Sequence, residues 1–200
     1  MAHLMRLDVV VAGVGGQGVV SLARLLVEAA IREGFDGHLL AQSGLAQLGS
    51  PVIAHTRIGS PAKPSPKIPL GAAHLVVGLE RLEALRLAPY LAPDGHALLS
   101  EEPVRPYHAR FHKECYPEIG EVEAAFGARV TTWIPAHRLA RELGPPGLVS
   151  AVMLGALAGA TPVIERDNLV LCLRETRPEW ADVEVEAFFA GYRFVTGRDH

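Results

Sequence analysis

Apolar and polar residues follow two alternating patterns along the chain, which predict strands and helices in turn. Short, nearly continuous apolar runs predict strands at residues 6–12, 37–42, 51–58, 74–78, 95–99 and 128–134. Helical spacing predicts helices at residues 18–32, 80–91, 121–126, 136–143, 148–159, 166–174 and 179–196. In the first helix the apolar positions are Val20, Ala23, Leu26, Val27 and Ala30.

This order of elements predicts an α/β fold of three layers, with a Rossmann-like, mostly parallel sheet and helices on both faces. The strand at 51–58 follows the strand at 37–42 closely, which favours some antiparallel pairing. The helical C-terminal third is expected to form a layer that supplies an interface. The proline-rich segment 60–69 predicts a stiff surface loop, or an arm that reaches a partner subunit. No domain boundary is evident, so we expect one domain over residues 1–200.

Composition excludes several classes of protein. Hydrophobic residues make up 49% of the 200 positions and charged residues 20%, which argues against disorder. The net charge is −3 and no basic stripe is present, which argues against nucleic-acid binding. The uncharged run at 147–164 predicts a buried helix, because its many small residues and Pro162 suit a packed core better than a membrane. No signal peptide is visible, so we expect a cytoplasmic protein.

The cysteines and histidines give little sign of a metal site. Cys115 and Cys172 are the only cysteines, whereas an iron–sulfur cluster takes about four thiolates. His108 and His112 would share one face of a helix, with Glu114 and Cys115 beyond them, and could form one corner of a zinc site. No second Cys or His pair lies nearby, so we expect exposed histidines and no bound metal.

A glycine-rich turn follows the first predicted strand directly, and it is the most informative stretch of the chain. Its residues are Gly13, Gly15, Gly16, Gln17 and Gly18. Glycine allows positive φ and close approach, and the helix behind exposes free N–H groups. The spacing fits the dinucleotide pattern G-x-G-x-x-G, but the second strand ends in Gln42 and Ser43, without the acidic residue that holds a ribose. A nucleotide site, a tightly packed turn and a docking surface all remain open.

Other candidate residues each have a structural alternative. His55 and Arg57 share one face of a strand, so they either line a pocket or are buried with partners. Glu80 follows the fourth strand, where it could meet a ligand or stabilise a helix N-terminus. No nucleophile, base and orienting group can be assembled from the sequence, so we expect no catalytic residue in this chain.

Residues 13–18, Gly-Val-Gly-Gly-Gln-Gly, resemble the start of the gamma subunit or domain of 2-oxoacid:ferredoxin oxidoreductases. Within that family the likeness is greatest to the small beta subunit of indolepyruvate ferredoxin oxidoreductases. Residues 44–59 resemble the second motif, usually G-x-A-Q-R-G-G before a strand ending in Arg-Ile-Gly. Residues 152–157 and 178–191 are similar to the late buried helix and the C-terminal helix of the family.

The chain departs from the family pattern at four positions. Leu48 stands where Arg is usual, Ser50 where Gly is usual, and Ser150 and Glu184 where Asn is common. Leu48 cannot hold a phosphate or carboxylate as a guanidinium group does, so anion binding by that loop is not expected here.

The resemblance implies the overall reaction. A 2-oxoacid, in the nearest branch indolepyruvate or another arylpyruvate, is decarboxylated on thiamine diphosphate. The acyl unit passes to coenzyme A, and electrons pass through iron–sulfur clusters to ferredoxin. Thiamine diphosphate and the clusters are expected on a large partner subunit, because this chain has no ligands for them. Cofactors carry such chemistry, and protein surfaces position them.

The expected site is the glycine turn together with Gln47 and Gly49 of the second motif. The turn and these two residues would contact the partner subunit near its active site, or border the coenzyme A channel. Two alternatives remain: a stand-alone Rossmann-like enzyme that binds NAD(P) or a flavin, and a homodimeric binding module.

Overall fold

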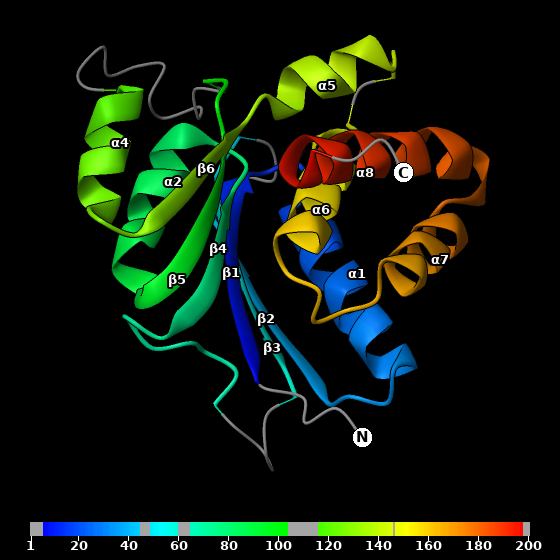
Figure 1. Cartoon of the computed structure of the whole chain (residues 1–200), viewed down its shortest axis with the longest axis horizontal. Coiled ribbons are helices and arrows are strands. Elements are labelled where there is room, and N and C mark those ends of the chain that lie inside the picture. The colour runs from blue at the N-terminus through cyan, green and yellow to red at the C-terminus, as the bar shows by residue number, and fades with distance from the viewer. Residues whose placement is uncertain (1–5, 45–48, 60–64, 104–115, 146, 198–200) are drawn as a thin grey trace.

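A six-stranded sheet lies between two layers of helices in the computed structural model (Figure 1). The structure describes residues 6–44, 49–59, 65–103, 116–145 and 147–197. The strands are β1 (Leu7–Val14), β2 (Gly37–Ser43), β3 (Pro51–Ile58), β4 (Ala73–Gly78), β5 (Leu91–Ser100) and β6 (Val130–Ile134). The helices are α1 (Val19–Arg32), α2 (Arg81–Leu87), α4 (Ile119–Phe126), α5 (Ala136–Glu142), α6 (Val149–Ala160), α7 (Arg166–Thr176) and α8 (Ala181–Thr196), with 3₁₀ turns η1 (Ala88–Tyr90) and η2 (Pro178–Trp180).

The strand order is β2-β3-β1-β4-β5-β6, and the sheet is mixed. β1, β4, β5 and β6 run parallel, whereas β3 is antiparallel to both of its neighbours, β1 and β2. The predicted mostly parallel sheet with some antiparallel pairing is therefore confirmed. The strand order differs from that of a dinucleotide-binding unit, because β3 separates β2 from β1.

The two faces of the sheet support separate hydrophobic clusters. Val9 and Val11 of β1 face the cluster built by α1, α6, α7 and α8. Val10 and Ala12 face the cluster built by α2 and α4. Successive residues of β1 thus face opposite helix layers, as in a strand that is buried on both faces. This arrangement confirms the three predicted layers. Figure 1 shows the C-terminal helices grouped with α1 on one side of the sheet.

The apolar run at 147–164 forms a buried helix, as expected. α6 has 12 residues and is buried along most of its length, because α8 crosses it closely. Gly155 and Gly191 permit this approach: a Cβ atom on either would overlap a main-chain carbonyl oxygen of the other helix, at Phe188 or Val152. Among the described residues, no helix is long and apolar enough to cross a membrane.

Several element boundaries differ from the sequence prediction. The helix expected at 80–91 ends at Leu87, and β5 begins at Leu91, because Leu91 pairs with Ala73 of β4. α4 begins before residue 121 because the side chains of Glu118 and Glu121 form a capping box at its start.

Candidate functional site

The glycine turn links the end of β1 to the start of α1 at the carboxyl edge of the parallel strands. Gly16 and Gly18 have φ of 99° and 83°, values that side chains other than glycine rarely adopt. Gly13 is required for a different reason: a Cβ atom there would lie 2.7 Å from Oε1 of Gln17 and 3.0 Å from Cβ of Leu79. The turn is thus specified by its backbone conformation and by close packing.

The side chain of Gln17 makes two hydrogen bonds among the described residues. The main-chain N–H of Val14 donates to its Oε1 at 2.8 Å, and its Nε2 donates to the carbonyl oxygen of Leu79 at 3.0 Å. Its side chain therefore joins the ends of β1 and β4, which are neighbouring parallel strands. From the sequence we expected the side chain of Gln17 to form hydrogen bonds with a partner. In the structure, its Oε1 and one N–H of its Nε2 instead bond to the main chain of this chain.

The second motif lies against the first through main-chain contacts. The N–H of Gly15 donates to the carbonyl oxygen of Ser50 at 2.8 Å, and the N–H of Gly49 donates to that of Gly15 at 3.1 Å. Gly49 thus lies beside the glycine turn, as expected, although the strand that brings it there is β3 rather than β2. Gln47 and Leu48 lie outside the described residues.

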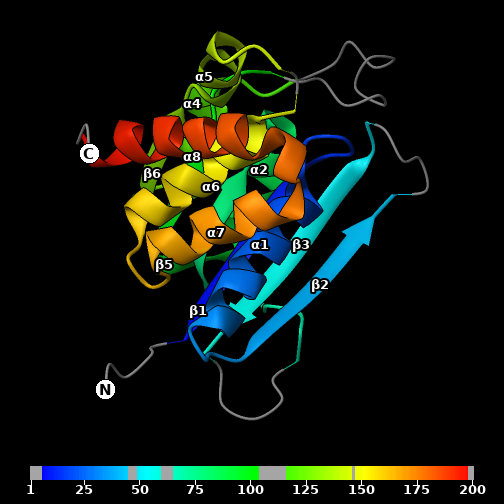
Figure 2. The ribbon, with the colours of Figure 1, turned by 90° about the vertical axis from the view of Figure 1, so that its right-hand side faces the viewer.

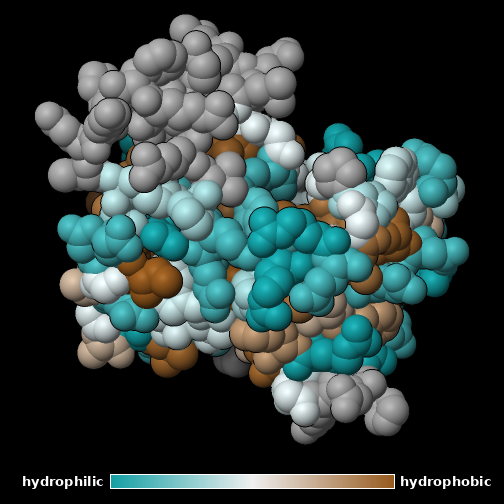
Figure 3. All heavy atoms as spheres, turned by 90° about the horizontal axis from the view of Figure 1, so that it is seen from above, coloured by the Kyte–Doolittle hydropathy of each residue, from teal (hydrophilic) through white to brown (hydrophobic). Residues whose placement is uncertain are grey.

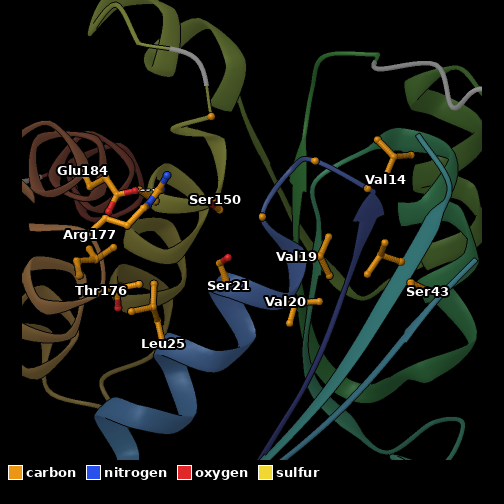
Figure 4. A pocket seen from close by; sticks show the side chains of 17 residues that line it. Val14, Val19, Val20, Ser21, Leu25, Ser43, Ser150, Thr176, Arg177 and Glu184 are labelled. Carbon is orange, nitrogen blue, oxygen red and sulfur yellow. Dashed lines mark hydrogen bonds and ion pairs between the residues drawn. The ribbon is translucent and has the colours of Figure 1, made fainter. Parts of the chain in front are cut away.

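A cavity of about 530 Å³ opens beside the turn. Its walls are the glycine turn, the first turn of α1, the ends of β2 and β3, the start of α6 and the junction between α7 and α8. Hydroxyl groups line it at Ser21, Ser43, Ser150 and Thr176. Figure 4 shows Ser21 and Ser150 on facing elements, with Arg177 and Glu184 on the far wall.

The N-terminus of α1 forms one wall of the cavity without a side-chain cap. Gly18 is its N-cap residue and offers no side chain, and no acidic residue lies in the first turn. A helix start leaves N–H groups without intrahelical acceptors and carries the positive end of the helix dipole. Ser150 of α6 packs against this start, since a Cβ atom on Gly18 would lie 2.5 Å from its Oγ.

A charged pair lies on the opposite wall. The guanidinium group of Arg177 donates to the carboxylate of Glu184. The side chain of Glu184 is 5% exposed and that of Arg177 is 48% exposed, so the carboxylate is buried while the guanidinium borders the opening. Two of the four departures from the family pattern, Ser150 and Glu184, therefore line the same cavity. The lining offers hydroxyl groups, main-chain groups and one ion pair, which suit binding rather than proton transfer.

Arg57 is buried and fully partnered, which supports its structural interpretation. His55 is buried too, and its Nδ1 accepts from the N–H of Ile68 at 3.4 Å, but its Nε2 has no hydrogen-bond partner among the described residues. Arg57 forms an ion pair with Asp8, with Nε 3.0 Å from Oδ1, and it donates to the carbonyl oxygen of Ser65 at 2.5 Å. Burial raises the pKa of Asp8, and the charges of Arg6 and His74 oppose this effect. Burial also lowers the pKa of His55, whose ring contacts Tyr90 edge to face. These contacts fix the segment after residue 64 against the sheet.

Glu80 is a helix cap rather than a ligand-binding group. Its carboxylate accepts from the N–H of Glu83 at 2.9 Å, at the N-terminus of α2. The hydroxyl of Tyr116 also donates to it, and burial together with this carboxylate raises the pKa of Tyr116 above its usual range.

The zinc candidates His108, His112, Glu114 and Cys115 lie outside the described residues. Within the described ranges, no group of three or more His, Cys, Asp or Glu is placed to hold a metal ion.

The fold and the cavity define an α/β domain that presents a glycine turn and a polar cavity at the carboxyl edge of its parallel strands. The sequence profile of the family described as pyruvate ferredoxin/flavodoxin oxidoreductase matches residues 8–194, and the chain belongs to that family. It is a small subunit of the 2-oxoacid:ferredoxin oxidoreductase type, which confirms the resemblance seen in the sequence.

Similar proteins support this assignment over most of the chain. Indolepyruvate oxidoreductase subunit IorB of Archaeoglobus fulgidus is 31% identical, over 97% of this chain and 98% of that protein. Pyruvate synthase subunit PorC of Methanothermobacter thermautotrophicus is 30% identical, over 83% of this chain and 82% of that protein.

Solved structures share the fold. The pyruvate oxidoreductase subunit PORC of Thermotoga maritima aligns with a TM-score of 0.69 at 21% identity, covering 94% of this chain and 96% of that one. A 2-oxoglutarate:ferredoxin oxidoreductase of Magnetococcus marinus aligns with a TM-score of 0.75 at 17% identity. That alignment covers 96% of this chain and 31% of the other, so this fold makes up a part of the longer chain.

The far wall of the cavity was not predicted from the sequence. Thr176 and Arg177 reach it only because α7 and α8 fold back beside α1, a long-range arrangement that periodicity does not encode. The departures at Ser150 and Glu184 were the available signal, although nothing in the sequence showed that both residues face the glycine turn.

Proposed function

We propose that this chain is the small subunit of an indolepyruvate, or other arylpyruvate, ferredoxin oxidoreductase. The IorB relatives support this substrate class, because four of them match at 30–31% identity over at least 93% of this chain. Residues 1–200 act as one gamma-type domain, which works in the cytoplasm.

A large partner subunit holds thiamine diphosphate and the iron–sulfur clusters in this proposal. The described part of the chain has one cysteine, Cys172, which is buried, and it has no metal-ligand cluster. These residues do not fit an iron–sulfur cluster. The partner therefore supplies the redox chemistry, and this chain supplies a surface.

The observation that carries the proposal is the cavity beside the glycine turn, lined by hydroxyl groups and an uncapped helix start. Gly13, Gly15, Gly16, Gln17, Gly18 and Gly49, with Gln47, form the surface that meets the partner subunit or borders the path of coenzyme A. Hydroxyl and main-chain N–H groups can bind phosphate and amide groups of such a substrate without a charged side chain. Arg177 adds a cationic edge to the same opening.

The NAD-type alternative is not supported by the sheet. The acidic residue of a dinucleotide site comes from a strand beside the first one. Here β3 occupies that place, and β2 ends in Gln42 and Ser43.

Filling the cavity tests the proposal in the co-expressed complex of both subunits. Ser21 is exposed on α1 and faces the cavity, so Ser21→Tyr places a ring there without disturbing the core. We expect Ser21→Tyr to lower turnover of indolepyruvate with coenzyme A by about tenfold or more, since losing positioning of one substrate commonly costs that much. Arg24→Tyr is the matched control, because Arg24 is on the same helix but is not part of the cavity lining.

The readouts separate the parts of the proposal. Co-purification with a cluster-containing large subunit, and a preference for indolepyruvate over pyruvate and 2-oxoglutarate, are the expected results for partner and substrate class. Wild-type kcat and KM in Ser21→Tyr would contradict the role of the cavity.

A further inference from the structure

The outer edge of β2 has the features of a strand that pairs with another strand. β2 has seven residues, Gly-His-Leu-Leu-Ala-Gln-Ser, and it is the terminal strand of the sheet. Figure 2 shows it outermost on its side of the molecule, beyond β3. No strand among the described ranges pairs with this edge. β2 also has no Lys, Arg, Asp, Glu or Pro, the residues with which sheet edges are commonly protected from association.

The hydrogen bonds to β3 show which groups of β2 point outward. In an antiparallel pair, hydrogen-bonded and non-hydrogen-bonded residue pairs alternate. The N–H of Gly44 donates to the carbonyl oxygen of Pro51, and the N–H of Gly59 donates to that of Asp36. With the register of the two strands, His38, Leu40 and Gln42 therefore bond to β3. The remaining residues direct their N–H and C=O groups away from the sheet: Gly37, Leu39, Ala41 and Ser43.

We infer that two copies of this chain pair through β2 in antiparallel fashion, about a two-fold axis at Leu40, to form one continuous sheet. In this register Gly37 lies opposite Ser43 of the second copy, and Leu39 lies opposite Ala41. Every outward N–H and C=O group then has a partner, which gives about eight main-chain hydrogen bonds. A register shifted by two residues leaves some of these groups without partners.

The side chains suit this self-pairing. Leu40 meets Leu40 of the second copy across the axis, and His38 meets Gln42, so no like charges are opposed. α1 packs over β2 and β3, and the two-fold axis places both α1 helices on the same face of the joined sheet. Val20 of α1 is 43% exposed and lines the same cavity as Ser43 of β2, so it adds apolar surface near that end of the strand. These features favour β2 of a second copy of this chain as the strand that pairs with this edge.

Proline substitution tests the pairing through an outward N–H group. Ala41→Pro removes an N–H that no hydrogen bond among the described residues uses, so the β2–β3 ladder is retained. We expect the full-length wild-type chain to be dimeric by sedimentation. We expect Ala41→Pro to raise the dimer dissociation constant by about tenfold or more, because two symmetric hydrogen bonds are lost. Circular dichroism checks that the fold is unchanged.

Cysteine cross-linking tests the register. Residues opposite each other at a non-hydrogen-bonded position have Cβ atoms close enough for a disulfide. Under mild oxidation, Leu40→Cys should give a covalent dimer, whereas His38→Cys alone should not. His38→Cys combined with Gln42→Cys should restore the dimer. The wild type, with its own Cys115 and Cys172, is the background control.

Three results would overturn the inference. They are a monomeric wild type at all concentrations, a dimer that Ala41→Pro leaves intact, and equal cross-linking of His38→Cys and Leu40→Cys. The inference is independent of the proposed function, because neither Ala41 nor Leu40 lines the cavity. An inactive complex would therefore leave it standing.

Discussion

At the scale of single residues, the chemistry of the glycine turn depends on what its one polar side chain does. Gln17 accepts from Val14 and donates to Leu79, so it holds the carboxyl ends of two parallel strands together. The sequence predicted an important glutamine at this position. It could not show the internal role, because Leu79 becomes a neighbour only when β1 pairs with β4. Glu80 is a similar case. The sequence allowed it to meet a ligand or to stabilise a helix N-terminus, and the structure supports the helix cap.

Truncation of Gln17 should therefore destabilise the chain itself. We expect Gln17→Ala to lower the free energy of unfolding by about 1–3 kcal/mol, because it leaves polar groups of Val14 and Leu79 without their partner. Urea denaturation of the isolated chain measures this change. Arg24→Ala, on the exposed face of α1, is the control and should stay within about 0.5 kcal/mol of the wild type. A Gln17→Ala variant as stable as this control would mean that the side chain is free to meet a partner.

At the scale of elements, apolar periodicity predicted the strands and helices well, but it did not predict their neighbours. The run at 51–58 was recognised as a strand, yet its insertion between β2 and β1 depends on pairing between distant segments. α6 was recognised as a buried helix because its run of residues is uncharged and rich in small residues, and because Pro162 follows it. Its close crossing with α8 depends on glycines in two helices, which no local pattern connects.

The α6–α8 crossing gives a prediction at this scale. A methyl group at residue 155 would meet the main chain of α8 at Phe188, which is backbone and cannot simply rotate away. We expect Gly155→Ala to lower the free energy of unfolding by about 1–3 kcal/mol, as overpacked cores do. Thermal unfolding checks this.

The matched control is Gly120→Ala in α4. Gly120 is exposed, and a methyl group on it would have no described atom within 4 Å, so this substitution should be neutral or slightly stabilising. Equal stability of the two alanine variants would show that the helices separate readily.

At the scale of the whole molecule, the family could be predicted from short motifs, whereas the cavity could not. Residues 13–18 and 44–59 were enough to indicate a small subunit of a 2-oxoacid:ferredoxin oxidoreductase, and the family match over residues 8–194 confirms it. The cavity requires α1, α6, α7 and α8 to converge, so its far wall became visible only in three dimensions.

Figure 3 views the molecule from the carboxyl edge of the parallel strands. Among the residues coloured there, the hydrophobic ones form separate patches between hydrophilic residues, not one continuous apolar area.

We propose above all that this chain lacks a complete active site and becomes part of an enzyme only with a large partner subunit. Indolepyruvate-dependent reduction of a viologen dye with coenzyme A tests this conclusion, when it is measured with the chain alone and with the co-purified complex. We predict no turnover above the buffer background for the chain alone and clear turnover for the complex. Sustained turnover by the solitary chain would contradict the conclusion.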